Sequence, residues 1–246
     1  MAPCESGWAR GRHSVRPAGR RRQWRKRHLA GENGLYAPCG RNPTAGGRPA
    51  DVAARAAKIV AAFDAANLQD PNSEIVEGKT VAKEWIYAQR MSAQLSRFCP
   101  DASEALQLAT RSQHICRWKI PRSDYPMDRS GYKKWRLDLA QMHGDIAGEI
   151  MAAQGYDETI ISRVKDLLLK RSLKRDEEVQ TLEDVICLVF IEFYLEDFAS
   201  KHDEEKLIDI IRKTWNKMSE KGHQAALKLP LSDAMVGLVG KALSAT

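Results

Sequence analysis

Residues 176–200, DEEVQTLEDVICLVFIEFYLEDFAS, include the longest apolar run of the chain, Val185 to Ile191. Asp176, a residue that can cap a helix, precedes the run, and no glycine or proline interrupts the stretch. Because the run is apolar on every side of a helix, we expect this helix to lie at the centre of the protein. The run is far shorter than the ~20 apolar residues that cross a bilayer, so the sequence predicts no membrane segment.

Helical signals follow one another on both sides of this central stretch, and strand signals are few. The expected helices run over residues 51–67, 80–98, 101–118, 128–155, 157–171, 176–200 and 203–222, with short ones near 224–227 and 233–243. Asp101 with Glu104 has the pattern of a capping box, and Gly155 that of a helix end. No internal repeat occurs. The sequence therefore predicts an all-α fold, a compact single domain of about eight helices over residues 51–246.

Residues 1–50 differ from the rest in composition. They hold 11 of the 39 Lys and Arg residues, only two acids, and half of the glycines and prolines. Such a segment cannot bury enough apolar surface to offset its chain entropy, so a disordered basic tail is expected. Its run RRRQWRKR at residues 20–27 fits a nucleic-acid arm, a nuclear address, part of an organelle transit peptide, or an extension that simply stays solvated.

The remaining 196 residues carry 28 basic and 30 acidic side chains, so the helical part is almost neutral despite the basic chain. Binding to nucleic acid is therefore expected only through the tail. The cysteines are Cys4, Cys39, Cys99, Cys116 and Cys187. Their odd number and the lack of any C-x-x-C pair argue against a disulfide framework and predict an intracellular, reducing environment, the cytoplasm first.

Two histidines are candidates for chemistry. His143 shares the apolar face of its helix with Leu139 and Ile146, so its ring should point inward. An inward imidazole suits a metal site, but a core histidine satisfied by one hydrogen bond fits equally. His114 is expected near the end of its helix, on a more polar face. It could line a cleft or be an ordinary hydrogen-bonded surface histidine.

Two acids, Glu183 and Asp184, stand directly before the central apolar run. A carboxylate beside such a helix is costly to bury unless a cation, an arginine or a lysine compensates it, which makes Asp184 the acid most suspected of a role in chemistry. The alternative is that both acids favour the start of the helix through its dipole.

A basic stretch lies between the two histidines. Its cations are Arg117, Lys119, Arg122, Arg129, Lys133, Lys134 and Arg136, and the aromatic residues Trp118, Tyr125, Tyr132 and Trp135 are interleaved with them. Arginine forks beside aromatic rings suit a phosphate or a nucleotide. A solvated helix face with packed aromatic rings is equally compatible with the pattern.

Together these residues resemble the HD-domain superfamily of helical metal-dependent phosphohydrolases, over about residues 84–199. Tyr87-Ala88-Gln89-Arg90-Met91 resembles its first motif, Gln113-His114-Ile115 its second, His143-Gly144-Asp145 a further histidine element, and Leu182-Glu183-Asp184 the final aspartate element. Tyr87 and Ile115 stand where the superfamily has metal ligands.

The resemblance implies a divalent metal ion (Mn, Fe, Co, Mg or Zn) held by His114, His143 and Asp184. It also implies phosphate or ligand binding by Arg117, Trp118, Arg122, Arg129 and Tyr87, with Glu183 or Lys170 assisting proton transfer. Loss of two ligands would normally cost most of the metal affinity.

A closer resemblance covers residues 51–243. Segments 113–122, 125–132, 182–190 and 213–223 are similar to phrases of a family of uncharacterised helical proteins, members of which are often labelled glutamyl-tRNA synthetase. Class I synthetases carry H-I-G-H and K-M-S-K-S motifs, and residues 114–117 and 217–221 have a similar order. Those motifs belong to a parallel nucleotide-binding sheet, which this sequence does not predict, so an aminoacyl-tRNA synthetase is only a remote alternative.

Three hypotheses follow. The first is a metal-dependent phosphohydrolase-like domain that acts on a phosphate ester or nucleotide with a degenerate ligand set. The second is a non-catalytic binder of an anionic ligand or protein partner in the same cleft, which Tyr87 and Ile115 favour. The third is nucleic-acid binding by the tail alone.

Overall fold

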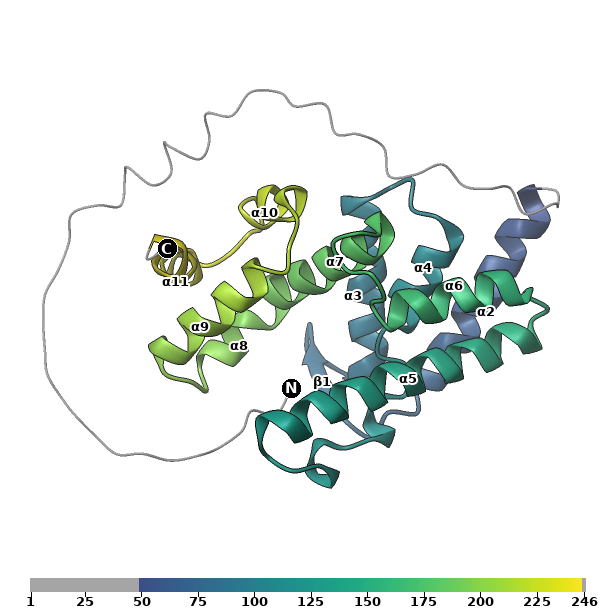
Figure 1. Ribbon diagram of the computed structural model, residues 1–246, viewed down its shortest axis with the longest axis horizontal. Helices are drawn as coiled ribbons and strands as arrows, with labels where there is room; N and C mark the ends of the chain where they lie inside the picture. Colours follow the sequence, from purple (N-terminus) through teal and green to yellow (C-terminus); the bar gives the residue numbers. More distant parts are fainter. Residues whose placement is uncertain (1–48, 245–246) are drawn as a thin grey trace, which may run out of the picture. The chain divides into compact units, whose positions relative to one another are not determined.

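The computed structural model describes residues 49–244, which fold into ten α-helices, two short 3-10 helices and one hairpin (Figure 1). The helices are α2 (Pro49–Asn67), α3 (Lys83–Phe98), α4 (Glu104–Ser112), α5 (Arg129–Ala153), α6 (Glu158–Leu168), α7 (Glu177–Phe193), α8 (Leu195–Ala199), α9 (Glu204–Trp215), α10 (Glu220–Ala226) and α11 (Asp233–Ser244), with η1 (Arg117–Lys119) and η2 (Arg122–Asp124) between α4 and α5. The mostly helical fold is confirmed. The tail expected over residues 1–50 lies almost wholly outside the described range.

The helix expected from residue 80 begins later, at Lys83, because a hairpin precedes it. Strands β1 (Ser73–Val76) and β2 (Lys79–Ala82) pair antiparallel, with Val76 opposite Lys79. The two turn residues, Glu77 and Gly78, have φ values of 50° and 75°. Positive φ at both positions is typical of a tight type I′ turn, which glycine adopts without strain. Glu-Gly between two runs of β-branched residues was the local signal of this hairpin.

Helix α7 contains the apolar run and lies among other helices, as its sequence predicted. Asp176 caps it by accepting hydrogen bonds from the backbone N–H groups of Glu178 and Val179. It contacts α3, α4, α6 and α10 (Figure 1). Its fully buried side chains are Val179, Leu182, Val185, Leu188 and Val189. The central position is therefore a consequence of an all-round apolar surface.

The expected continuous helix over residues 176–200 is in fact two. Tyr194 leaves the helical conformation, with φ −125° and ψ −15°, and separates α7 from α8. Its hydroxyl accepts a hydrogen bond from Arg90 Nη1 at 2.8 Å, which ties this break to α3. A contact 104 residues away in sequence thus accompanies the break, and no local pattern could reveal it.

Helix starts agree well with the sequence where a capping acid was expected. Asp128, Asp157 and Asp203 each accept a hydrogen bond from a backbone N–H in the first turn of their helices. At α4 the expected cap is wrong, because Ser103 and not Asp101 accepts the bond from Leu106 N at 3.1 Å. Helix α4 also ends at Ser112, so His114 lies in a turn beyond it.

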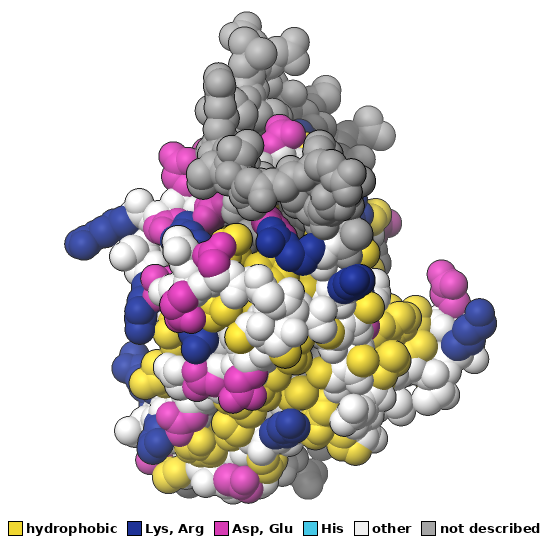
Figure 2. Space-filling model, turned by 90° about the vertical axis from the view of Figure 1, so that its right-hand side faces the viewer, with side chains coloured by type: hydrophobic (Ala, Val, Ile, Leu, Met, Phe, Trp, Pro, Cys, Tyr) yellow, Lys and Arg dark blue, Asp and Glu magenta, His cyan; other side chains and the backbone are white. Residues whose placement is uncertain are grey.

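Charges on the described residues are mixed. In Figure 2, acidic and basic side chains alternate with apolar ones over the face shown, without one continuous basic field. Within residues 49–244, no helix combines the length and the apolar character that crossing a membrane would require.

Candidate functional site

A pocket of about 260 Å³ lies where the turn after α4, helix α5 and the end of α6 meet. Its polar lining consists of Gln113, His114, Arg117, Arg136, His143 and Lys170. Its apolar lining consists of Leu137, Leu139, Ala140, Leu168 and Leu169. Four of the residues singled out in the sequence, His114, His143, Arg117 and Lys170, therefore meet in one pocket.

The turn after α4 brings His114 and Arg117 to this pocket. Cys116, between them, has a left-handed backbone with φ 53°, which costs a residue with a side chain about 1–3 kcal/mol. The buried side chain of Asn67 holds the strained turn, since its Oδ1 accepts a hydrogen bond from Cys116 N at 3.0 Å. Helix α2 thus stabilises a backbone geometry that the pocket requires.

His114 is held from three directions. Its Nδ1 lies 3.2 Å from Glu84 Oε2, its Nε2 lies 3.4 Å from Arg117 Nη1, and its ring stacks on Tyr87 with the ring centres 4.0 Å apart. A neutral ring with the proton on Nδ1 satisfies both polar contacts, because it donates to the carboxylate and accepts from the guanidinium. Burial, reinforced by Arg117, keeps the pKa of His114 well below its ordinary value.

Tyr87 supports this histidine and does not line the pocket itself. Its hydroxyl donates to Gln113 Oε1 at 3.0 Å. Burial raises the pKa of Glu84, the partner of His114 Nδ1, while the nearby Arg117 opposes that rise. Ile115, the other position where the HD superfamily has a ligand, is fully buried in the core.

His143 points inward, as its helical position indicated, and is only 3% exposed. Its Nδ1 lies 2.7 Å from the backbone oxygen of Ile115. A carbonyl oxygen only accepts, so Nδ1 carries the proton and Nε2 is a bare acceptor. Within residues 49–244, no protein group pairs with Nε2, which is shielded from bulk solvent. Burial lowers the pKa of His143 to about 3, and the ring is neutral.

Lys170 enters the pocket from the loop after α6. Its backbone is left-handed, with φ 53°, and its ammonium pairs with the buried carboxylate of Glu183. Burial lowers the pKa of Lys170, although Glu183 opposes that shift. For Glu183, burial favours a higher pKa, but the charges of Lys170 and Lys217 outweigh it and hold the pKa below its usual value.

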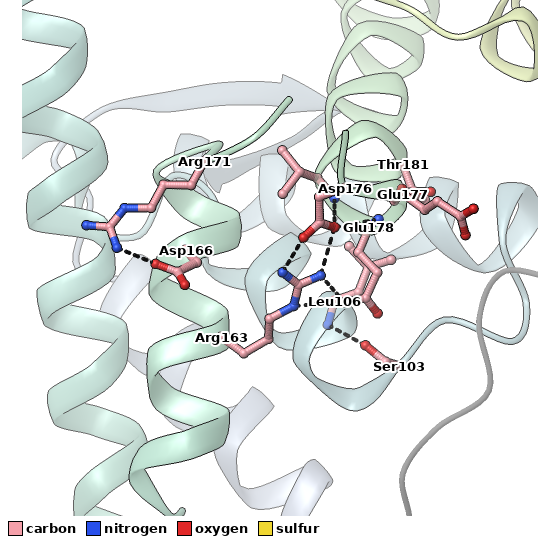
Figure 3. A network of polar contacts seen from close by, with 10 residues as sticks. Ser103, Leu106, Arg163, Asp166, Arg171, Asp176, Glu177, Glu178 and Thr181 are labelled. Atoms are coloured by element: carbon pink, nitrogen blue, oxygen red, sulfur yellow. Dashed lines mark hydrogen bonds and ion pairs between the residues drawn. The ribbon is translucent and has the colours of Figure 1, made fainter. Parts of the chain in front are cut away.

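The loop that carries Lys170 is anchored by an ion-pair network (Figure 3). Arg163 of α6 makes a two-pronged contact with Asp176, at 2.6 and 2.9 Å, and its Nε donates to Glu178 at 3.0 Å. Asp176 is also the cap of α7, so one carboxylate fixes both ends of the loop. The hydrogen bond to Arg163 lowers the pKa of Asp176.

Asp184, the expected third metal ligand, does not line the pocket that contains His114 and His143. Its carboxylate accepts hydrogen bonds from the Ser219 backbone and hydroxyl and from Gln180 Nε2 at 3.1 Å. A Cβ placed on Gly222 would come within 2.7 Å of this carboxylate, so α10 packs directly on it. Across residues 49–244, no group of three or more His, Cys, Asp and Glu side chains is arranged to hold a metal ion. The geometry does not fit the ligand set His114, His143 and Asp184.

The other expected ligand residues lie outside the pocket lining. Arg122 donates to the backbone oxygens of Tyr125 and Pro126, at 2.9 and 2.7 Å, and so holds its own loop. Trp118 packs partly buried against the core, and Arg129 is exposed at the first turn of α5.

The K-M-S-like segment of residues 217–221 likewise has a local role, because Ser219 caps α10. The sheet found in the described chain is an antiparallel hairpin, not the parallel sheet that synthetase motifs need.

The sequence did not predict site roles for two residues: Arg136, which lines the pocket and was expected only as one cation of the basic stretch, and Glu84, which does not line the pocket but contacts His114. Both carried a usable signal. Glu84 precedes Tyr87 by three and Met91 by seven residues, which places a carboxylate on the buried face of α3. Arg136 precedes His143 by seven residues, two helical turns, and so shares its face of α5.

Comparison with known proteins gives one family. The model described as Domain of unknown function (DUF4202) matches residues 57–239, which include every pocket residue. No curated protein and no solved structure matches the chain.

Proposed function

The chain belongs to the DUF4202 family, whose description assigns no activity, and we propose from the pocket itself that the protein binds a phosphorylated small molecule there. The observation that carries the proposal is the convergence of Arg117, Arg136 and Lys170 on one pocket. These cations come from the turn after α4, from α5 and from the loop after α6, so only the fold unites them.

The charge balance supports an anionic ligand. Glu84 contacts Arg117, with an N–O distance of 3.8 Å, and Glu183 pairs with Lys170. In the described part of the chain, neither a hydrogen bond nor an ion pair of Arg136 is found, although its charge acts on those of Arg117 and Lys170. Three like charges in a half-buried site repel one another, and a dianion relieves that repulsion. The forks of two arginines suit phosphate oxygens.

The size and the apolar wall limit the ligand. A volume of about 260 Å³ lies just below the 300–1,000 Å³ that is usual for small-molecule sites. Leu139, Ala140 and Leu168 offer apolar contact to an organic group beside the phosphate. We therefore favour a compact phosphomonoester, or a mononucleotide whose base extends into solvent.

Arg136→Gln tests the proposal, with Arg129→Gln as the matched control on the same helix. Wild-type protein should gain thermal stability with inorganic phosphate and with small phosphomonoesters, because a ligand that binds only the folded state stabilises it. Loss of one charged hydrogen bond should weaken binding about tenfold or more in Arg136→Gln. Arg129→Gln should bind as wild type does. An equal loss in both variants, or no binding at all, would refute the proposal.

Metal-dependent hydrolysis is the second candidate, and one observation favours it: two histidines, His114 and His143, lie on the same pocket with ring centres 5.9 Å apart. The arrangement of carboxylates does not support a metal ion, so we assign no step to one. Elemental analysis of the purified chain for Mn, Fe, Co, Mg and Zn tests this candidate. A stoichiometric metal that is lost in His114→Ala, together with phosphatase activity, would replace the binder with an enzyme.

A further inference from the structure

We propose that His143 makes the pocket selective for an anion that also presents an O–H group, such as hydrogen phosphate, over a fully deprotonated anion of the same shape and charge, such as sulfate. The inference rests on the proposed function and adds the chemistry by which the site distinguishes its ligand. The feature that carries it is a buried, unpartnered acceptor among cationic donors.

The protonation of His143 follows from its hydrogen bond. Because the oxygen of Ile115, 2.7 Å away, can only accept, the proton is on Nδ1 and the lone pair is on Nε2. The ring lines the pocket, and among the described residues no donor reaches Nε2. A group that meets this nitrogen must therefore bring a proton of its own.

The neighbours of His143 do not change this requirement. His114, 5.9 Å away between ring centres, uses Nδ1 for Glu84 and Nε2 for Arg117. The cations Arg117, Arg136 and Lys170 can only donate, so they suit the bare oxygens of an anion. Of the pocket's ring nitrogens, Nε2 of His143 is left to accept.

This division of donors and acceptors predicts that the pocket discriminates hydrogen phosphate from sulfate. Sulfate would place an oxygen lone pair against the Nε2 lone pair and would leave a buried acceptor unpaired. Hydrogen phosphate has the same tetrahedral shape and donates its single proton. Sites that hydrogen-bond a ligand hydroxyl reject the analogue that lacks it, because their buried polar groups are left unpaired. A single bond of this kind corresponds to about ten- to hundredfold in affinity.

The experiment compares phosphate with sulfate by calorimetry on the full chain. The pH is set above the second ionisation of phosphate, so that both anions carry two negative charges. Wild-type protein should bind phosphate about ten- to hundredfold more tightly than sulfate. His143→Asn keeps a donor for the Ile115 carbonyl and removes Nε2, so its two affinities should converge. Arg136→Gln should weaken both anions by the same factor and leave the preference unchanged.

The outcomes separate the two proposals. Equal affinity for phosphate and sulfate in the wild-type protein overturns the selectivity and leaves anion binding intact. Binding of neither anion overturns the proposed function and the selectivity with it. Unchanged preference in His143→Asn also contradicts the role of His143. If that variant melts below the assay temperature, His143→Leu, which also lacks an acceptor at this position, replaces it under the same criteria.

A second pair of ligands identifies the source of the proton. Glycerol phosphate and propyl phosphate carry the same dianionic ester group, but only the former has free hydroxyls. If the natural ligand is a hydroxylated phosphomonoester, glycerol phosphate should bind more tightly, and His143→Asn should remove that difference. Tighter binding of inorganic phosphate than of both esters would instead identify the free anion as the ligand. A preference for propyl phosphate that survives in His143→Asn would contradict the proposal.

Discussion

At the scale of single residues, the pocket depends on where a few protons lie. His143 donates through Nδ1 and is neutral, and a neutral His114 satisfies Glu84 and Arg117 together. Burial lowers the pKa of both rings. The side chains that carry charge in the pocket are therefore Arg117, Arg136 and Lys170, a composition suited to anions over a wide range of pH.

The low pKa of His143 predicts acid sensitivity of the fold. The unfolded chain takes up a proton near the ordinary value of 6.5, but the folded ring resists protonation down to about 3. Below 6.5 the unfolded state thus binds more protons, so stability falls as the pH decreases from 6.5 towards 3. At pH 5 the loss from this ring is about 2 kcal/mol.

Urea unfolding of wild-type protein and His143→Asn at pH 7.5 and pH 5 measures this loss. The difference in unfolding free energy between the two proteins should shrink at pH 5, because only the wild type loses stability through this ring. A difference that is the same at both pH values would show that His143 does not titrate as its burial requires.

At the scale of secondary-structure elements, the site depends on three irregular joints: the turn after α4, the loop after α6 and the start of α7. Asn67 holds the turn, Arg163 holds the loop, and Asp176 caps the start of α7. Arg117 and Lys170 are thus presented by or beside strained backbone, whereas the regular helix α5 presents Arg136 and His143.

Asp176→Ala should therefore affect both stability and binding. The variant loses the cap of α7 and the contact with Arg163, and we expect a loss of about 1–2 kcal/mol in unfolding free energy. Ligand affinity should also fall, because the loop that carries Lys170 is released. Denaturant unfolding and the phosphate titration measure the two effects.

Asp166→Ala is the control, since it removes an exposed ion pair with Arg171 beside the same network (Figure 3). Its cost should stay below about 0.5 kcal/mol, and phosphate binding should be unchanged. If both variants behave alike, the anchoring role of Asp176 is wrong.

At the scale of the whole molecule, charge is divided between two parts of the chain. Residues 1–50 hold a net excess of nine positive charges, while the remaining residues are nearly neutral. The described part has mixed charges on the face in Figure 2, and three cations, Arg117, Arg136 and Lys170, gather in the pocket. Long-range attraction to polyanions and local binding of a small anion should therefore be separable.

A chain that begins at residue 49 should keep phosphate binding and lose any affinity for RNA or DNA. Nucleic-acid binding by the full chain should weaken steeply with added salt, because the basic residues release counterions from the phosphate backbone. Fluorescence anisotropy with a labelled oligonucleotide at several salt concentrations measures the nucleic-acid affinity of each chain and its dependence on salt. Tight, salt-resistant binding by the shortened chain would contradict the division.

Interactions between residues that are close in sequence explain which structural features the sequence could predict. Asp128, Asp157, Asp176 and Asp203 marked helix starts because a capping carboxylate acts within its own first turn. Periodicity likewise oriented His143. The break at Tyr194 was missed because the contact that accompanies it, with Arg90, is distant in sequence.

Glu183 and Asp184 show that adjacency in the sequence does not predict a shared role, even within one helix. Successive residues of a helix point about 100° apart, so one carboxylate faces Lys170 and the other faces Ser219. Sequence adjacency suggested a shared role, and packing gave them different ones.

By itself, the sequence of this protein determined an almost wholly helical domain, its central helix, the inward histidine and the basic composition of residues 1–50, because apolar periodicity, capping and charge composition act locally. Only the tertiary structure decided that Arg117, Arg136 and Lys170 share one pocket with His143, and that Asp184 does not. Those relations depend on which helices pack together, and packing joins residues that have no proximity along the chain.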